Sequence, residues 1–419
     1  MLDIHKLRKN GEEIERKLQT RDSSLSLSEI LELDAHRLEL IGKVEELKAE
    51  RNRGSQEVGR LKREGKDASE QIKAMSTVAA QIGELDSELA EVSKRISYLL
   101  SLLPNVPHES VPVGKKEEKL ILRSHGEAPK QDFPIKHHLA IAEEKGLLDF
   151  TRGAMIAGAR FPMYVGAGAM LEMALIQYMF FYHSRRGYTP VFPPFLANPE
   201  SFYVSSQLPK FADEDYYCEK DDLYLTPTAE TLLANLHRGE ILSPNDLPEK
   251  YVAYTPCFRR EAGTYGEDER GLIRVHQFNK VELFKYTTPE SSYDELELLI
   301  TDVEGVLQAL GMHYRVALLP TQDLAQQATK TVDLEVYLPG QGRYYEVSSC
   351  SNCEDFQARR GNTRYRPAEG EKPEYVHTLN GSGVATPRLM AAILENNQTS
   401  DGRIRIPAVL QEMMGAEYL

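Results

Sequence analysis

Residues 258–282, FRREAGTYGEDERGLIRVHQFNKVE, combine side chains of the types that bind a nucleotide. If both ends of this stretch are strands of one hairpin, the side-chain period of two places Arg259 and Glu261 on one face. Phe278 and Glu282 share a parity on the returning strand. A guanidinium suits a phosphate, a ring stacks on a base, and a carboxylate accepts from an exocyclic amine. A salt-bridged surface hairpin is the alternative, but it gives no reason for the aromatic ring.

A second stretch, NGSGVATPRLMAAILENNQ at residues 380–398, has the composition of a glycine-rich turn followed by a helix. Gly381 and Gly383 lack a Cβ atom and so allow a close approach of backbone to a ligand. Pro387 suits the first turn of a helix, and Arg388 follows it directly. Because the positive end of the helix dipole lies at the same place, we expect a binding pole for polyphosphate. Glycines are common before helices, so an ordinary turn is the alternative.

A third stretch, YEVSSCSNCEDFQARR at residues 345–360, offers hard oxygen ligands close together. Glu346, Ser348 and Ser349 lie within four residues of one another. Magnesium that is bound with a nucleotide usually needs only one or two protein oxygens. The stretch therefore predicts a magnesium site, with an ordinary strand that carries hydroxyls as the alternative.

The cysteines form neither a secreted disulfide framework nor a recognisable zinc site. Cys350 and Cys353 make one CxxC, and no second pair accompanies it. A structural zinc site needs four ligands. We therefore interpret the cysteines as structural or incidental and expect no structural zinc.

The three stretches described above lie in a part of the chain that is predicted to contain both strands and helices. Strand composition marks YVAYTPCFRRE, LIRVHQFNKVELFKY, HYRVALLP, VDLEVYLPG and RYYEVSSCS, while GAGAMLEMALIQYMFFYHSRR and SSYDELELLITDVEGVLQAL are helical in pattern. No regular alternation of strand and helix is present, so a parallel sheet is disfavoured. The predicted fold is α+β, an antiparallel sheet with helices packed on it.

The N-terminal part differs, because residues 27–102 contain no proline and follow a heptad pattern. Seam positions recur at alternating spacings of three and four, first at Val44, Leu47, Arg51, Gly54, Val58 and Leu61 and then at Ile72, Met75, Ala79 and Ile82, and Leu89 and Ile96 continue the heptad. Gly65 and Asp67 mark a break between two helices. We predict an antiparallel helical arm in a domain of residues 1–103, a proline-containing linker at 104–118, and a second domain at 119–419.

The expected tip of this arm is basic. Residues 48–66 carry an excess of four positive charges in a chain whose net charge is −14. The basic side chains of most interest are Arg51, Arg53, Arg60, Lys62 and Arg63. They indicate either an ordinary solvated face of a coiled coil or a reach for nucleic-acid phosphates.

The bulk composition sets limits on the class of protein. With 419 residues the chain is long enough for about two domains, and 41% hydrophobic content supports a sizeable core. The acidic total argues against a surface that is basic throughout, but a local basic patch is compatible with it. No apolar run is long enough for a membrane span, and the first residues lack an export signal. We expect a cytoplasmic protein without a membrane partner.

Taken together, these stretches resemble class II aminoacyl-tRNA synthetases, and specifically the bacterial type of seryl-tRNA synthetase. FRREAG…RGLIRVHQFNKVE resembles motif 2 of that class, NGSGVATPRLMAAILENNQ motif 3, and GYTPVFPPFL motif 1, which forms a dimer interface. TPTAE and EVSSCSNCEDFQARR are similar to signatures of the seryl enzymes, as is the helical arm. The resemblance covers nearly the whole chain.

The resemblance implies a serine–tRNA ligase, a homodimer that uses ATP and Mg²⁺ and charges tRNA(Ser), and tRNA(Sec) where present. It implies catalytic roles for Arg259 and Arg388, and magnesium ligation by Glu346 and Ser349. The implied ATP-binding residues are Arg259, Arg260, Glu261, Val275, Phe278, Glu346, Val347, Ser348, Ser349 and Arg388. The implied serine-binding residues are Thr228, Ala229, Glu230, Arg259, Glu282 and Ser382. The arm would contact tRNA through Arg51, Arg53, Arg60, Lys62 and Arg63.

Some positions depart from the usual pattern of this family. Arg260 stands where serine is usual, and the acidic Glu267–Glu269 occupies a loop that usually carries a basic residue. The resemblance gives neither a role. Two other classes of function are the alternatives: a synthetase-like enzyme that loads an amino acid onto a carrier protein, and a structural coiled-coil protein with an inert body. The arm argues against the first, and the intact arginine and glutamate set argues against the second.

Overall fold

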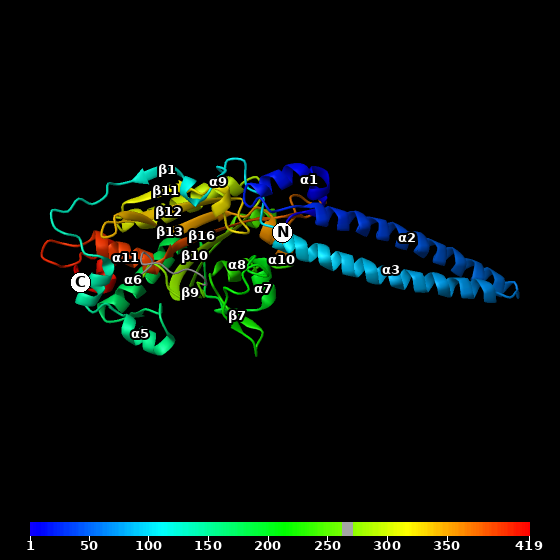
Figure 1. Cartoon of the computed structure of the whole chain (residues 1–419), viewed down its shortest axis with the longest axis horizontal. Coiled ribbons are helices and arrows are strands. Elements are labelled where there is room, and N and C mark those ends of the chain that lie inside the picture. Colours follow the sequence, from blue (N-terminus) through cyan, green and yellow to red (C-terminus); the bar gives the residue numbers. More distant parts are fainter. Residues whose placement is uncertain (262–270) are drawn as a thin grey trace. The chain divides into compact units, whose positions relative to one another are not determined.

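Two long helices dominate the N-terminal unit, Leu2–Leu103, in the computed structural model, which describes residues 1–261 and 271–419. The unit consists of α1 (Ile4–Gln19), α2 (Ser28–Arg63) and α3 (Ser69–Leu102). Figure 1 shows α2 and α3 side by side, and cross-helix ion pairs fix their direction. Glu29 near the start of α2 pairs with Arg95 near the end of α3 at 2.6 Å, and Lys48 pairs with Asp86 at 3.4 Å. The predicted antiparallel arm is confirmed.

The seam between the two helices follows the predicted heptad only in part. Val44, Leu61, Ile82 and Ile96 are buried as expected. Ile72, however, is 46% exposed, and in the middle of α3 Val78 is buried in place of Ala79. A straight helix of 3.6 residues per turn drifts against a repeat of 3.5, so the buried stripe moves by one residue along a long helix.

The second unit, Pro104–Leu419 together with Met1, is built on an eight-stranded sheet. In spatial order its strands are β1 (Leu120–His125), β11 (Tyr314–Leu318), β12 (Lys330–Leu338), β13 (Arg343–Asn352), β16 (His377–Ala385), β10 (Gln277–Thr287), β9 (Glu249–Phe258) and β4 (Thr189–Val191). All neighbours are antiparallel except β4 and β9. The predicted α+β fold is therefore confirmed (Figure 1).

Helices and short strands surround this sheet. The helices are α4 (His138–Glu144), α5 (Phe150–Ala157), α6 (Ala167–Ser184), α7 (Pro199–Val204), α8 (Glu230–Leu233), α9 (Ser292–Ala309), α10 (Phe356–Gly361), α11 (Thr386–Asn396) and α12 (Ala408–Met414). The short strands are β2 (Leu148–Asp149), β3 (Met163–Tyr164), β5 (Leu196–Ala197), β6 (Tyr217–Cys218), β7 (Leu223–Leu225), β8 (Ile241–Leu242), β14 (Arg364–Tyr365) and β15 (Glu374–Tyr375). None of the helices in residues 1–261 and 271–419 is both long and apolar enough to cross a membrane.

The glycines of β16 serve the packing of helices on the sheet. A Cβ atom on Gly381 would lie 2.5 Å from the side chain of Leu299 on α9. One on Gly383 would lie 3.1 Å from the ring of His183 on α6. The two glycines therefore let α6 and α9 approach β16, and the expectation that they open the backbone to a ligand is replaced by a role in the core.

A bulge changes the facing of side chains along β13. Ser348 and Glu346 pair with consecutive residues of β12, so Val347 is one extra residue. In a regular strand without the bulge, Glu346 would share a face with Ser348, two residues further on. With it, Glu346 and Ser349 line the same cavities. The extra residue thus separates the three predicted oxygen ligands into two that lie together and one that does not.

A second bulge lies on β16, the strand next to β13 in the sheet. Val384 and Ser382 pair with consecutive residues of β10, so Gly383 is the extra residue. Ser382 and Ala385, three apart in sequence, consequently line one cleft. On both β13 and β16, the set of alternate side chains that faces the cleft therefore changes at a bulge.

The segment that follows the arm is held by hydrogen bonds to main-chain oxygens of the second unit. Asn105 Nδ2 donates to the carbonyl oxygens of Gln327 and Cys353, at 2.9 and 2.8 Å. Residues 104–118, expected to form a linker, thus begin as a hydrogen-bonded part of this unit.

Candidate active site

One cleft at the ends of β9, β10, β13 and β16 gathers most of the predicted site residues. It has two lobes, which share Arg259, Glu261, Lys280, Glu346 and Ser382 among their linings. The Phe278 lobe, of 200 Å³, also takes in Val275, Phe278, Val347 and Arg388. The Glu230 lobe, of 420 Å³, also takes in Thr228, Glu230, Ser349, Asn380 and Gln327.

Arg259 and Glu261 both line the cleft, but not because they alternate along a strand as predicted. β9 ends at Phe258, and only the main-chain N–H of Arg259 continues the pairing, donating to the carbonyl of His276 at 2.9 Å. Glu261 has a positive φ of 49°, a left-handed conformation that few residues other than glycine adopt. This turn, rather than a period of two, directs its carboxylate into the Phe278 lobe.

An aromatic ring and an ion pair flank these two side chains. The guanidinium carbon of Arg259 lies 5.2 Å from the centroid of the Phe278 ring. Glu261 Oε2 lies 2.5 Å from Nε of Arg274, a residue of the cleft that had no predicted role. The predicted strand LIRVHQFNKVELFKY begins only at Gln277, so Arg274 precedes the regular strand. The alternation of faces along a strand therefore could not predict that Arg274 lies in the cleft.

Arg388 bridges two walls of the Phe278 lobe. It lies in the first turn of α11, with Pro387 also in that turn. Its Nε donates to the carbonyl oxygen of Ile273 at 3.1 Å, and its Nη1 donates to the carbonyl oxygen of Glu346 at 2.8 Å. Nη1 also lies 3.2 Å from Oε2 of Glu346. Burial alone would raise the pKa of Glu346, but the charges of Arg388 and Arg259 outweigh it and lower the pKa.

The Glu230 lobe is organised around a buried carboxylate. Glu230 is the first residue of α8, and its oxygens accept from Gln327 Nε2 at 2.8 Å, Gln357 Nε2 at 2.7 Å and Asn380 Nδ2 at 3.3 Å. Burial, followed by the charge of Glu282, raises the pKa of Glu230 to about 7. The three amide side chains come from segments far apart in sequence, and none was predicted.

Glu282 lies beneath the cleft and not on its surface. It is fully buried and lines neither lobe. Its Oε2 lies 2.6 Å from Nζ of Lys280 and accepts from Thr228 Oγ1 at 3.4 Å. Lys280 lines both lobes, but it was not predicted as a site residue. The sequence carried a signal for it, because Lys280 lies two residues after Phe278 and so shares its face of the strand. Ala229 is also fully buried and has no side chain in the cleft.

A further cavity of 360 Å³ adjoins the Glu230 lobe through Glu346 and Ser349. Asp333 on β12 lines it, directly opposite Ser349 in the sheet register. Asp333 is buried, and its Oδ1 has no hydrogen-bond partner within the described part of the chain. Burial, and then the charge of Glu346, raises the pKa of Asp333. A carboxylate, a hydroxyl and this unpaired oxygen form a donor set that fits a hard divalent cation.

Two predicted ATP ligands are used elsewhere. Ser348 is turned away by the bulge, and its hydroxyl donates to the carbonyl of Ser382 at 2.5 Å. Arg260 lines neither lobe. Its main-chain N–H donates to the carbonyl of Glu214 and its Nε to that of Asp215, both at 3.0 Å.

The guanidinium carbon of Arg260 also lies 5.2 Å from the centroid of the Tyr216 ring. Arg260 thus fastens residues 214–216 beside the Glu230 lobe, which Glu214 and Asp215 help to line. Burial, followed by the charge of Glu214, raises the pKa of Asp215 to about 7. Asp215 is a second unpredicted carboxyl group of this lobe.

Other predicted features lie outside the cleft. The acidic Glu267–Glu269 falls within residues 262–270, outside the residues that the structure describes. Cys350 and Cys353 are fully buried, and burial raises the pKa of both thiols.

In the helical arm, the predicted basic residues differ in their surroundings. Arg60 is paired with Glu57 of α2 at 2.7 Å and with Glu64, the residue just after α2, at 2.8 Å. Arg63 Nε donates to the carbonyl oxygen of Gly59 at 3.1 Å. Arg51, Arg53 and Lys62 are exposed, as are Arg60 and Arg63. The positive charge of Arg60 is therefore partly balanced by its own helix, and that of the others is displayed.

Two families match the chain. Residues 1–107 match the family described as "Seryl-tRNA synthetase N-terminal domain". Residues 213–397 match "tRNA synthetase class II core domain (G, H, P, S and T)". The second match spans the strands and helices that build the cleft.

Full-length relatives agree with these matches. A "Serine--tRNA ligase" of Syntrophobacter fumaroxidans is 50% identical over 417 residues, 99% of either chain. One of Carboxydothermus hydrogenoformans is 50% identical over 421 residues, 100% of this chain and 99% of the relative. The crystal structure of seryl-tRNA synthetase from Pyrococcus horikoshii complexed with ATP superposes with a TM-score of 0.95, at 39% identity, covering 100% of this chain and 99% of that one. A cytoplasmic serine–tRNA ligase from Naegleria fowleri in complex with AMP gives 0.89, at 29% identity, covering 100% and 98%.

Proposed function

The chain belongs to the seryl-tRNA synthetase family, and we propose that its cleft joins serine to ATP and then transfers the seryl group to tRNA(Ser). tRNA(Sec), where an organism has it, is proposed as a second acceptor. The observation that carries the proposal is the meeting of Arg259, Arg388 and Glu346 with the carboxylate-lined Glu230 lobe in one cleft. Phosphate-binding and amine-binding groups then stand side by side, as a reaction between an amino acid and ATP requires.

ATP is proposed to occupy the Phe278 lobe, as the ATP complex of the Pyrococcus relative supports. The Phe278 ring would stack on the adenine, and Glu261 would accept from its exocyclic amine. The side chains of Val275 and Val347 would form apolar walls. Arg259 and Arg388 would hold the phosphates, since a planar guanidinium matches two phosphate oxygens at once.

Serine is proposed to occupy the Glu230 lobe. The carboxylate of Glu230 is available to the amino or hydroxyl group of serine, with Thr228 and Ser382 at its sides. Glu282 would act from below, through Lys280 and Thr228. Alanine and glycine lack the hydroxyl, so a buried polar group would lose its partner and selection by about 10²-fold or more would follow.

The first step needs alignment and charge stabilisation rather than a base. The carboxylate of serine is ionised at neutral pH. Its oxygen forms a bond to the α-phosphorus of ATP while the bond from phosphorus to pyrophosphate breaks. Arg259 would orient the carboxylate and stabilise charge on the phosphoryl oxygens. In the second step the terminal ribose hydroxyl of tRNA attacks the seryl carbonyl, and AMP leaves.

Mg²⁺ is proposed to be held by Glu346 and Ser349, whose oxygens the bulge of β13 places together. When bound it would neutralise phosphate charge. The neighbouring guanidiniums lower the pKa of Glu346, which keeps its carboxylate ionised and able to ligate.

The arm is proposed to bind tRNA. Arg51, Arg53, Lys62 and Arg63 display positive charge near the tip of the helical pair, and Arg60 displays part of its charge. Contacts of this kind with phosphates bind nucleic acid without reading bases. Cytoplasm is the proposed location, since the tRNA substrates are there.

A homodimer is proposed through an exposed apolar face of the second unit. Met170, Met173 and Phe181 of α6 and Phe192 after β4 are all exposed. They line a cavity of 310 Å³. Exposed apolar residues that gather in one patch indicate an interface, and GYTPVFPPFL, which contains Phe192, resembles the dimer motif of the class.

One pair of assays separates this function from its alternatives. Serine-dependent exchange of pyrophosphate into ATP is measured first, and charging of total tRNA second. Activity in both supports the ligase. Exchange without charging indicates an enzyme that loads a carrier protein, and inactivity in both indicates a structural protein.

A further inference from the structure

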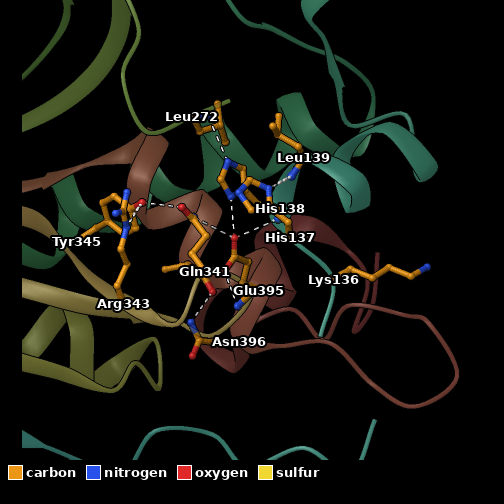
Figure 2. A network of polar contacts seen from close by, with 12 residues as sticks. Lys136, His137, His138, Leu139, Leu272, Gln341, Arg343, Tyr345, Glu395 and Asn396 are labelled. Atoms are coloured by element: carbon orange, nitrogen blue, oxygen red, sulfur yellow. Dashed lines mark hydrogen bonds and ion pairs between the residues drawn. The ribbon is translucent and has the colours of Figure 1, made fainter. Parts of the chain in front are cut away.

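A buried histidine and a buried glutamate form a hydrogen-bonded cluster next to the Phe278 lobe (Figure 2). His138, the first residue of α4, and Glu395, near the end of α11, are both almost fully buried. Nδ1 of His138 lies 2.8 Å from Oε1 of Glu395, which also accepts from the main-chain N–H of His138 at 3.1 Å. Oε2 of Glu395 accepts from the N–H of Gly340 at 2.9 Å. None of these groups has a part in the proposed reaction.

The spacing of His137, His138 and Glu395 is compatible with a metal site, but the hydrogen bonds favour another role. Nε2 of His138 accepts from the main-chain N–H of Leu272 at 3.4 Å, so the ring proton resides on Nδ1 and faces Glu395. Nδ1 of His137 accepts from the N–H of Leu139 at 3.1 Å. A metal would have to displace these contacts, so the cluster is a clamp with a defined tautomer.

The clamp holds a segment that forms a wall of the cleft. Leu272 and Ile273 are buried and line the Phe278 lobe. His138 accepts from the N–H of Leu272, and Arg388 donates to the carbonyl of Ile273 at 3.1 Å. Arg388 and Glu395 lie on the same helix, two turns apart. Helix α11 therefore holds this segment twice, directly through Arg388 and indirectly through His138.

The chain passes so close to the ring that only glycine fits beside it. Gly271 has a φ of +74°, and a Cβ atom there would lie 2.6 Å from Nε2 of His138. A glycine at this point is needed both for the left-handed turn and for the contact. The histidine ring thus lies directly against the chain at Gly271, the residue before the Leu272–Ile273 wall.

We propose that His138 is a positioning residue for ATP, which acts by fixing the Leu272–Ile273 wall and, through it, Arg388. This inference rests on the proposed function, because it gives His138 a part in the ATP half of that reaction. The acceptor on Nε2 is the part of the ring that matters, and Glu395 serves to orient the ring with Nδ1 toward its carboxylate and Nε2 toward Leu272.

A matched pair of variants separates the two sides of the ring. His138→Gln keeps an acceptor near the Nε2 position and loses the bond to Glu395, whereas His138→Asn does the reverse. The Kd of ATP, measured by calorimetry, and the KM values of ATP and serine in exchange are compared. We expect His138→Asn to weaken ATP about fivefold, the effect of one hydrogen bond, with His138→Gln and the KM of serine within about twofold of the wild type.

A second pair of variants tests the contact between the His138 ring and Gly271 by changing the glycine. Gly271→Ala places a methyl group against the ring, while Gly311→Ala imposes similar backbone strain at φ +71° with nothing within 4 Å. We expect only Gly271→Ala to raise the Kd of ATP. Ring ¹⁵N shifts of wild-type His138 should show a protonated Nδ1 and a bare Nε2.

The inference is overturned if ATP binding is unchanged in His138→Asn and Gly271→Ala while unfolding temperatures fall, since the clamp is then only structural. The opposite tautomer overturns it too, as does zinc binding to the wild type that is lost in Glu395→Gln. Absence of exchange in the wild type would instead count against the proposed function, because the Kd of ATP is measured independently of serine.

Discussion

Lys280 and Glu282 form a buried ion pair under the cleft, with Nζ of Lys280 2.6 Å from Oε2 of Glu282. The two residues alternate with Val281 along β10 and so share a face. The other oxygen of Glu282, Oε1, has no hydrogen-bond partner among the described residues. The pair therefore leaves one charge incompletely satisfied, directly below the Glu230 lobe.

Removing the lysine should harm both stability and serine binding. In Lys280→Met the carboxylate of Glu282 is left buried without its partner, and we expect the free energy of unfolding to fall by about 3 kcal/mol. Lys285→Met is the control, because Lys285 is also buried, pairs with Glu295 at 2.7 Å and lies outside both lobes. Denaturant unfolding should report a loss in both variants, and exchange assays a raised KM of serine in Lys280→Met alone. A raised KM in both would contradict a specific role.

The raised pKa of Glu230 should appear in the pH profile for serine. Burial, then Glu282, raises it from 4.5 to about 7, so the carboxylate ionises only as the pH passes about 7. If the ionised form binds serine, the KM of serine falls as pH rises through this range. Glu230→Gln should have a higher KM that depends less on pH between about 6 and 8, with only the titration of Asp215 left in this lobe. The same titration in Glu230→Gln and the wild type would refute the assignment.

The same shift has a consequence for stability. Because the folded state binds this proton more tightly than the unfolded chain, the favourable contribution of Glu230 is complete below pH 4.5 and is lost as pH rises to about 7. Unfolding of Glu230→Gln should therefore depend less on pH in this window than unfolding of the wild type.

Glu346 should be required for binding a divalent cation. With ATP present and serine absent, bound Mn²⁺ is measured by electron paramagnetic resonance. Glu346→Gln should lower the Mn²⁺ affinity by about tenfold or more, since one charged ligand is lost. Glu354→Gln, just beyond the same strand and outside both lobes, should behave as the wild type. Equal affinities in all three proteins would exclude Glu346 as a ligand.

Reversing charge at the tip of the arm should separate the two steps. With Arg51, Arg60 and Arg63 changed to Glu, we expect weaker tRNA charging, with the loss relative to the wild type greatest at low salt, and unchanged pyrophosphate exchange. Arg60→Glu alone should have the smallest effect, because Glu57 and Glu64 already balance that arginine. Lys43→Glu with Lys94→Glu serves as a control elsewhere on the arm. Parallel losses in charging and exchange would show that the substitutions act on the fold.

An acidic residue on the apolar face should break the dimer. Met173 is 62% exposed and Phe192 74% exposed in the single chain. Met173→Asp with Phe192→Asp should yield a monomer in sedimentation velocity, because an interface does not bury unpaired carboxylates. Leu298→Asp, on α9 and 53% exposed, should leave the oligomer intact. A wild-type monomer would refute the proposed dimer.

Much of this architecture could be predicted from local patterns. Heptads predict the arm, strand composition predicts most of the sheet, and the Thr-Pro-Arg sequence predicts that Arg388 lies in a helical first turn. Because faces alternate along β10, Phe278 and Lys280 lie on the same face, so the sequence also indicates Lys280 as a residue of the site.

What could not be predicted depends on register or on distant segments. The left-handed turn at Glu261 replaces strand parity, and no pattern announces it. Asp333 comes into the site through the pairing of β12 with β13, and Gln327 through the turn that precedes β12. Gly381 faces a helix that is remote in sequence. Arg260 looks like a ligand because of its neighbours, yet its partners are the main-chain oxygens of a segment some 45 residues earlier, since it bonds Asp215.

The bulges at Val347 and Gly383 determine which side chains of β13 and β16 face the cleft. Before each bulge one parity faces the cleft, and after it the other does. Without the bulge, a regular strand that ran through Val347 would place Glu346 and Ser348 on one face and turn the hydroxyl of Ser349 away from the cleft. Chemistry at these strands is thus encoded by the position of each bulge as well as by residue identity, so a change that paired the extra residue into the sheet would exchange the side chains that face the cleft.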